Sequence, residues 1–261
     1  MRSNFVSHPL AIFSHKKQLA RSFAQPAILH PFQLSTMNAK TYNTACAIST
    51  MNDSGIHCIT SGKREEASFI FQQSLREVRR QMTTEMAPAH DVITTFQPIA
   101  TEACNHVKMQ DRFTHDACFE IYDIAFSIKF LNGNEANLAF GAAAMLYNMA
   151  LNDHVTFIST GASNHLKRAT SLYKKALQIM FSQDEQDEDC GKCLFLLALC
   201  NNLGHCFTNV CDVHGKKTCQ QQLEYILSDP ECASYLSMED FEFFHLNSLV
   251  ASADVKAASA A

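Results

Sequence analysis

A short motif of asparagine, a large apolar residue and a small residue occurs twice in this 261-residue chain, and it constrains the fold more than any other feature. The first copy is Asn148-Met149-Ala150, and the second is Asn202-Leu203-Gly204. Small residues at fixed offsets between large ones indicate helices that cross so closely that only Ala, Ser or Gly fits at the contact. The repeat therefore predicts stacked helical hairpins.

A second motif follows the first copy and completes the hairpin. It reads Ala169-x₃-Tyr173-x₂-Ala176-Leu177, and a weaker version precedes both at Ala67-x₃-Phe71-x₂-Ser74-Leu75. Apolar residues recur at steps of three and four across residues 163–181, with basic residues between them, so this range is expected to form an amphipathic helix.

The chain between Pro98 and Pro230 holds no proline, which favours long helices in that region. Apolar periodicity predicts a helix beginning at Glu65 and four further helices over residues 136–156, 163–181, 191–208 and 213–228. Residues 83–117 are expected to form a long connection. A mainly α fold of antiparallel helical hairpins is therefore predicted.

Two aromatic segments fit a strand as well as a helix. Residues 119–128 resemble residues 241–250 position by position, and both are rich in aromatic and β-branched residues. They are predicted to pair as a small two-stranded ribbon on the helices. A helical alternative stays open for both segments, since Ile121, Ile124 and Ile128 would share a helical face.

The two ends of the chain differ in composition from the middle. Residues 1–63 hold three of the six prolines, and five basic residues but no acidic one precede Asp53. This composition is typical of a disordered tail or of an organelle transit peptide. The protein is expected in the cytoplasm or nucleus, or in the mitochondrion if residues 1–36 act as a transit peptide. Residues 64–252 are the predicted folded domain, and residues 253–261 an Ala-rich disordered tail.

Composition argues against several classes of function. A net charge of −5 and a pI near 6.2 argue against nucleic acid as a partner, because phosphate binding needs clustered Lys and Arg. No run of 18 apolar residues is present, so no membrane span is expected. The chain has no Gly-rich phosphate loop and no hydrolase motif. It is therefore predicted to be non-catalytic and to use no cofactor.

The cysteines support one alternative function. Eleven Cys without a secretory signal indicate a reducing compartment. The pair Cys190-x₂-Cys193 could act as a redox couple or as half of a zinc site. The residues before it are an acidic loop rather than a strand, and no second C-x₂-C follows at zinc-finger spacing. A Cys-rich thiol or zinc-binding protein is kept as the alternative.

The repeated residues resemble the tetratricopeptide repeat, a helix–turn–helix unit of protein-binding scaffolds. Leu146, Met149 and Ala150 match the first helix of such a unit, and Ala169, Tyr173 and Ala176 match its second helix. Cys200, Leu203, Gly204 and Phe207 match the first helix of the next unit. The order of motifs over residues 65–261 is most similar to that of the tetratricopeptide-like proteins abundant in diatoms.

The second helix of that next unit, from Lys216 through Leu223, matches poorly, and the first unit departs from the pattern in two places. Asp153 stands where an aromatic residue is expected, and about seven extra residues, around 158–163, separate the two helices of the first unit. The resemblance implies an α-α superhelix that binds another protein, as a peptide or helix, in a concave groove. It does not identify the partner.

Carried over by motif, the groove residues lie on the first helix of each unit. They include one aromatic and two histidines but neither Lys nor Arg, so a mixed apolar and polar peptide is expected. The alternative is that these positions are merely exposed, or are covered by the aromatic segment near Phe241. The candidate set is Ala144, Tyr147, Leu151, His154, Ala198, Asn201, His205 and Thr208.

Overall fold

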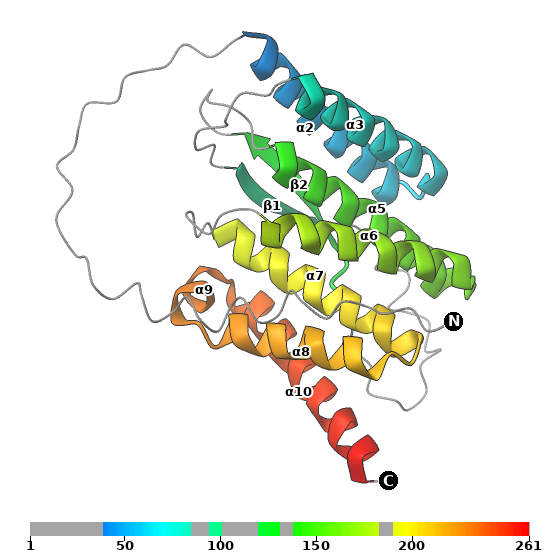
Figure 1. Ribbon diagram of the computed structural model, residues 1–261, viewed down its shortest axis with the longest axis vertical. Helices are drawn as coiled ribbons and strands as arrows, with labels where there is room; N and C mark the ends of the chain where they lie inside the picture. Colours follow the sequence, from blue (N-terminus) through cyan, green and yellow to red (C-terminus); the bar gives the residue numbers. More distant parts are fainter. Residues whose placement is uncertain (1–38, 85–93, 101–119, 131–137, 183–189, 261) are drawn as a thin grey trace, which may run out of the picture. The chain divides into compact units, whose positions relative to one another are not determined.

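The computed structural model describes residues 39–84, 94–100, 120–130, 138–182 and 190–260, which all belong to one compact unit spanning 37–261 (Figure 1). These residues are mostly helical, which confirms the predicted mainly α class. The proposed transit peptide at 1–36 lies outside the described residues.

Within the described residues, eight helices and two strands follow one another along the chain. The two strands come between the second and the third of these helices. The elements are α2 (Ala39–Thr60), α3 (Arg64–Thr84), β1 (Thr94–Ala100), β2 (Ile124–Phe130), α5 (Leu138–Thr160), α6 (Ser163–Ser182), α7 (Cys190–Asn209), α8 (Val213–Leu227), α9 (Pro230–Tyr235) and α10 (Met238–Ala260).

Three helical hairpins, α2/α3, α5/α6 and α7/α8, each close through a residue with positive φ: Gly62 at 73°, Gly161 at 72° and Cys211 at 55°. After α2, the amide of Lys63 donates to the carbonyl of Cys58, and after α7 the amide of Asp212 donates to that of Phe207. Both are the six-to-one hydrogen bond of a Schellman turn. The same local device therefore reverses the chain in two of the three hairpins.

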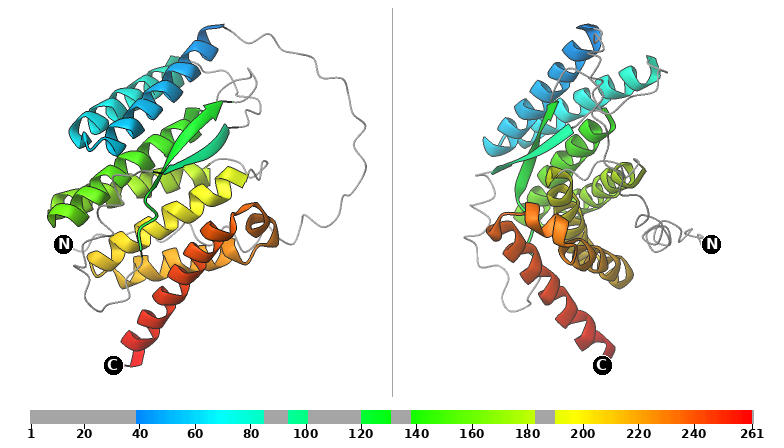
Figure 2. Two further views of the ribbon diagram at one scale, coloured as in Figure 1. Left: turned by 180° about the vertical axis from the view of Figure 1, so that it is seen from behind. Right: turned by 90° about the vertical axis from the view of Figure 1, so that its left-hand side faces the viewer.

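The hairpins pack in chain order. Helix α3 contacts α5, α6 contacts α7, and α8 contacts α10. Strand β2 contacts α2 and α5, while β1 contacts α7 and α5. Figure 2 shows both strands on the side of α2, α5 and α7, with α6 on the opposite side. The first helices of the hairpins thus lie between the second helices and the strands.

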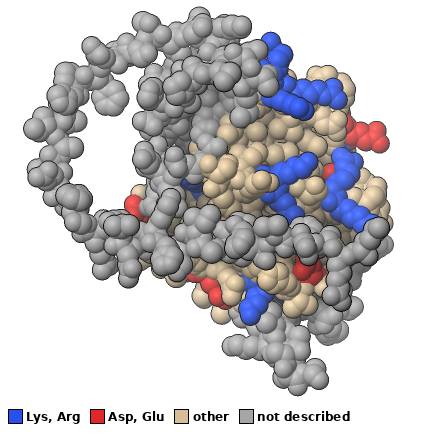
Figure 3. Space-filling model, in the orientation of Figure 1, with Lys and Arg blue, Asp and Glu red and all other residues tan. Residues whose placement is uncertain are grey.

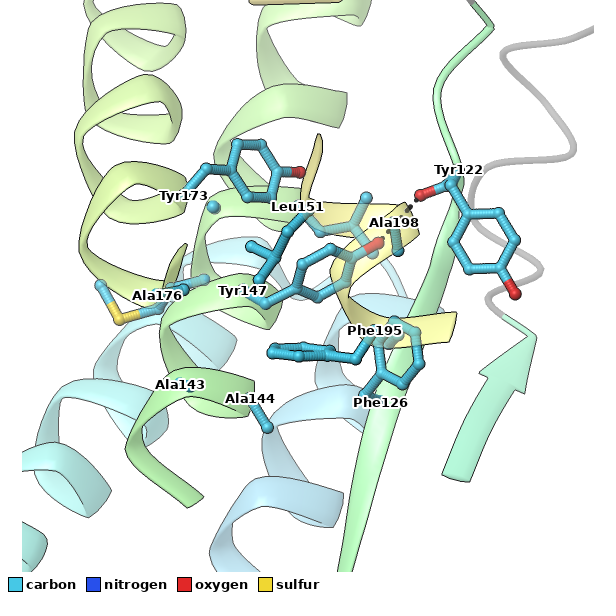
Figure 4. Packing of buried hydrophobic residues seen from close by; sticks show 14 of the residues in the cluster. Tyr122, Phe126, Ala143, Ala144, Tyr147, Leu151, Tyr173, Ala176, Phe195 and Ala198 are labelled. Atoms are coloured by element: carbon cyan, nitrogen blue, oxygen red, sulfur yellow. Dashed lines mark hydrogen bonds between the residues drawn. The ribbon is translucent and has the colours of Figure 1, made fainter. Parts of the chain in front are cut away.

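Because α5 and α7 are covered on two sides, they are buried over most of their surface. Helix α6 is amphipathic as predicted, with Leu166, Ala169, Tyr173, Ala176 and Met180 buried. The Lys and Arg side chains of its outer face contribute to the basic groups that gather on the face seen in Figure 3. Figure 4 shows the aromatic centre of the core, where Tyr147, Tyr173 and Phe195 meet.

Helix α2 shows that the predicted domain boundary at residue 63 is wrong. Ile48, Ile56 and Ile59 are buried in the core. The helix was missed because Thr, Ser, Asn and Gly give it low intrinsic helix propensity, which tertiary packing overrides. Gly55 has a packing role, since a Cβ there would lie 2.5 Å from the ring of Phe71.

Helix α10 overturns two predictions, the strand at 241–250 and the disordered tail at 253–261. The hydroxyl of Ser237 accepts a hydrogen bond from the Asp240 amide at 3.0 Å and donates to the Asp240 carboxylate at 2.6 Å. This N-terminal cap starts a helix that continues to Ala260. The aromatic residues at 241–244 suggested a strand, but the Ser-x-x-Asp motif before them decided the structure.

The predicted ribbon is therefore wrong in its pairing. Strand β2 begins inside the predicted segment 119–128 and ends at Phe130. It pairs antiparallel with β1, which lies in the region 83–117 that was expected to be a connection. Pro98 of β1 lies opposite Phe126. Its missing N–H is tolerated because the amide and carbonyl of Phe126 bond to helical side chains instead of to β1.

The two departures from the tetratricopeptide pattern have structural explanations. The extra residues around 158–163 mostly lengthen α5, which continues to Thr160 before a short turn at Gly161. Asp153 is buried, and its carboxylate lies 2.8 Å from His165 and 3.3 Å from Arg168, both on α6. An ionic contact thus joins α5 to α6 where an aromatic residue was expected.

Candidate functional site

Buried asparagines from four helices form one polar face, hereafter the asparagine face. Each points to the extended chain at 120–128, hereafter the bound segment, which includes the first part of β2. The face consists of Asn52 on α2, Asn148 on α5, Asn201 and Asn202 on α7, and Asn247 on α10.

The first contact holds Glu120. Asn247 accepts a hydrogen bond from the Glu120 amide at 3.1 Å and donates to the Glu120 carbonyl at 3.0 Å. Asn201 donates to the same carbonyl at 2.8 Å and accepts from Asn247 at 2.9 Å. Side chains from two helices, α7 and α10, thus bind the backbone of one residue.

The second contact holds Tyr122. The Asn202 side chain accepts from the Tyr122 amide at 2.7 Å and donates to the Tyr122 carbonyl at 2.9 Å. Its amide nitrogen also lies 3.1 Å from the hydroxyl of Tyr147 and 3.2 Å from that of Tyr173. Tyr147 in turn donates toward the carbonyls of Tyr122 and Ile124, as Figure 4 shows for the first of these.

The third contact holds Phe126 and repeats the geometry of the second. Asn148 accepts from the Phe126 amide and donates to the Phe126 carbonyl, both at 2.9 Å. Asn52 donates to the same carbonyl at 2.9 Å and accepts from Asn148. Beyond it, the Ser49 hydroxyl donates to the carbonyl of Ile128 at 2.7 Å.

These contacts follow the period of an extended chain, in which alternate residues point their amide and carbonyl to the same side. Side chains from the helices bind residues 120, 122, 124, 126 and 128. From residue 124 onward the other edge pairs with β1. The asparagine face therefore takes the place of a neighbouring strand and satisfies a strand edge with side-chain amides.

Two aromatic side chains of the bound segment are buried between helices. The ring of Phe126 lies edge-on to Tyr147 and Phe195, with centroids 5.1 and 5.0 Å away. Tyr122 packs on Phe243 and Phe244 of α10, and its hydroxyl donates to Asp240 at 2.9 Å. Burial, reinforced by the charge of Asp240, raises the pKa of Tyr122, so this residue stays a hydrogen-bond donor.

The sequence-predicted groove residues lie on this face but do not form an open groove. Tyr147 and Asn201 bind the bound segment directly. Ala144, Leu151 and Ala198 are fully buried, His154 and His205 are buried and contact each other, and Thr208 is half-buried and bonds within its own helix. Most of the predicted groove residues are therefore buried rather than solvent-facing, and the bound segment itself contacts two of them, Tyr147 and Asn201.

Sequence reasoning missed most of the residues that hold the backbone, namely Asn52, Asn148, Asn202 and Asn247, although two of them opened the repeated motif. The available signal was the recurrence of Asn itself. An amide at an inward position of a first helix has no role in helix packing and must find hydrogen bonds elsewhere.

A buried hydrogen-bond chain runs from the asparagine face into the core. The Tyr173 hydroxyl lies 3.5 Å from Nδ1 of His154, and Nε2 of His154 lies 2.9 Å from Nδ1 of His205. Asn209 donates to the same Nδ1 of His205 at 3.2 Å. These contacts fit a His154 that accepts at Nδ1 and donates at Nε2.

Both histidines are held neutral. Burial lowers the pKa of His154 well below its ordinary value, and the neighbouring His205 lowers it further. Burial also lowers the pKa of His205 to about 4. Neither ring carries charge at neutral pH, so the pair acts there as a neutral hydrogen-bond relay between α5 and α7.

The cysteine pair of the alternative hypothesis is described only in part. The side chain of Cys190 lies outside the description, and Cys193 lies with its sulfur 2.7 Å from that of Cys232 on α9. Within the described residues no group of three or more His, Cys, Asp or Glu side chains could hold a metal ion. Among the described helices, none combines the length and apolar character needed to cross a bilayer.

Comparison of the chain with profiles of known protein families, with curated proteins and with solved structures returned no match. The class of protein therefore rests on the hairpins and the asparagine face themselves.

Proposed function

We propose that this chain is a non-catalytic protein–protein interaction scaffold of the tetratricopeptide type. In this proposal its hairpins form a superhelix whose first helices hold an extended peptide segment on the asparagine face. The observation that carries the proposal is the repeated clamp in which one asparagine binds both the amide and the carbonyl of one backbone unit, seen at Tyr122 and Phe126.

Such clamps recognise any extended chain, because every residue except proline offers the same amide and carbonyl. Main-chain hydrogen bonds then set register, and pockets for alternate side chains set identity, as in peptide binding by strand addition. Several helices each contribute an asparagine to one continuous face. A stack of helical hairpins provides such an arrangement.

The proposal is tested by capture of partners from a native lysate, followed by hydrogen exchange on the complex rebuilt from purified components. A partner is expected to bind stoichiometrically and to change exchange in α5, α7 and the bound segment. Changes limited to the outer helices α3, α6 and α8 would move the binding surface away from the asparagine face. A failure to obtain any stoichiometric partner would contradict a scaffold role.

A second candidate function, a thiol-based one, is favoured by the contact between Cys193 and Cys232. Their sulfurs are closer than nonbonded atoms normally lie. Hydrogen peroxide would take one hydrogen from each thiol, so that the disulfide forms and the peroxide is reduced to two waters. The new bond would join α7 to α9 across 39 residues.

We expect the oxidised protein to gain about 3–4 kcal/mol of unfolding free energy, since a cross-link of this span restricts the unfolded chain. Urea unfolding with and without peroxide measures the gain, and mass spectrometry of unreduced peptides locates the bond. Cys193→Ser should abolish the effect and Cys190→Ser should preserve it. The reverse result would mean that the disulfide forms between Cys190 and Cys193 instead.

A further inference from the structure

The occupant of the asparagine face is a segment of the same chain, and its contacts define what else could bind there. The hydrogen bonds that the asparagines make to the segment all go to its backbone, so they carry no information about side-chain identity. Identity is read where the segment's side chains are buried. Tyr122 packs on α10, Phe126 packs between α5 and α7, and the Ser127 hydroxyl donates to Asp53 of α2. The side chain of Glu120 is exposed.

These two aromatic sites differ in chemistry. The site around Tyr122 ends at the carboxylate of Asp240, which accepts a hydrogen bond from the phenol, so tyrosine fits it better than phenylalanine. The site around Phe126 is lined by the rings of Tyr147 and Phe195, which meet the Phe126 ring edge-on. The face therefore selects an extended Tyr-x₃-Phe segment.

The stack of helices does not depend on the bound segment for its connectivity. Helix α3 packs directly on α5, and α6 packs directly on α7. The groups that contact the segment's backbone are side-chain amides and hydroxyls, and water can form their hydrogen bonds when the segment is absent. A vacated face would thus expose polar groups and two aromatic sites, as a peptide-binding groove does.

We propose that residues 120–128 are a built-in competitor and that the partner's ligand is an extended segment with the same Tyr-x₃-Phe pattern. This inference rests on the proposed function and names the chemistry of its partner. A tethered competitor acts at an effective concentration of about millimolar for a short linker. A ligand from another protein must therefore bind much more tightly than the segment itself, and its apparent affinity is reduced by the fraction of molecules whose face is occupied.

The test uses a fluorescent peptide with the sequence of residues 119–129 and the full chain in three forms. The first is the unmodified chain, the second carries Tyr122→Ala and Phe126→Ala, and the third carries Asp123→Ala as a matched control, because the half-buried Asp123 fills neither aromatic site. Fluorescence anisotropy measures binding. A control peptide has alanine in place of Tyr and Phe.

We expect the peptide to bind the double variant at least tenfold more tightly than the unmodified chain and the Asp123→Ala chain. The control peptide should bind none of them. If the double variant is unfolded, saturating peptide should restore its helical circular dichroism, since the peptide supplies the missing side chains. Equal affinity for all three folded forms, or no restoration of an unfolded one, would overturn the inference.

The outcome also separates this inference from the scaffold proposal. A captured partner that the peptide displaces supports both. If the peptide binds no form of the chain while a captured partner still binds, the built-in competitor is wrong and the scaffold stands. If the peptide binds as expected but no partner exists, the chemistry of the face is right and the scaffold proposal fails.

Discussion

Asn202→Leu is expected to lower the free energy of unfolding by about 3 kcal/mol or more. Leucine has a similarly branched but larger side chain, and it cannot accept the hydrogen bond from the Tyr122 amide or donate to the Tyr122 carbonyl. The carbonyl keeps the hydrogen bond from Tyr147, but the buried amide loses its acceptor, and an unsatisfied buried group costs about 1–3 kcal/mol. The hydroxyls of Tyr147 and Tyr173 lose a neighbour as well.

Urea unfolding followed by circular dichroism at neutral pH measures this loss. Asn164→Leu is the matched control, because Asn164 is exposed on α6 and the same change there should stay within about 0.5 kcal/mol. Equal unfolding midpoints for the two variants would mean that the clamp on Tyr122 is not part of what stabilises the fold. Retained stability with weaker protection of the bound segment in hydrogen exchange would separate segment binding from helix packing.

Helices α3, α6 and α8, each with an exposed face, were predictable from the sequence. Helix α6 has the period expected of such a helix, and its buried residues are those that the period selects. Helices α5 and α7 have little amphipathic contrast because the strands and the second helices cover them. Their long apolar runs without proline nevertheless located them within a few residues.

The asparagine face could not be derived from periodicity. An Asn on a buried helix face contributes nothing to an apolar stripe, and its partners here lie far away in sequence, as Asn247 does from Glu120. Only tertiary structure shows that the repeated Asn148 and Asn202 bind one extended segment. The segment itself alternates its backbone contacts with a period of two, while its residues Ile121, Ile124 and Ile128 would also share one face of a helix.

The buried histidine pair makes stability depend on pH in a defined direction. His154 and His205 have lowered pKa values in the folded protein, that of His205 about 4, against about 6.5 in the unfolded chain. Above pH 6.5 both states hold the rings neutral, so the full stability is present. As the pH falls below 6.5, the unfolded chain takes up protons that the folded protein does not, and stability is lost.

The expected loss is about 1.4 kcal/mol per pH unit for each histidine between pH 6.5 and 5. His154→Gln keeps a donor toward Nδ1 of His205 but cannot titrate, so it should reduce the slope of stability against pH by roughly half. Urea midpoints measured at several pH values give the slopes of the unmodified chain and of His154→Gln. An unchanged slope in His154→Gln would mean that the His154 ring is already protonated or hydrated in the folded protein. Water would then have to reach the hydrogen-bond chain from Tyr173 to His205.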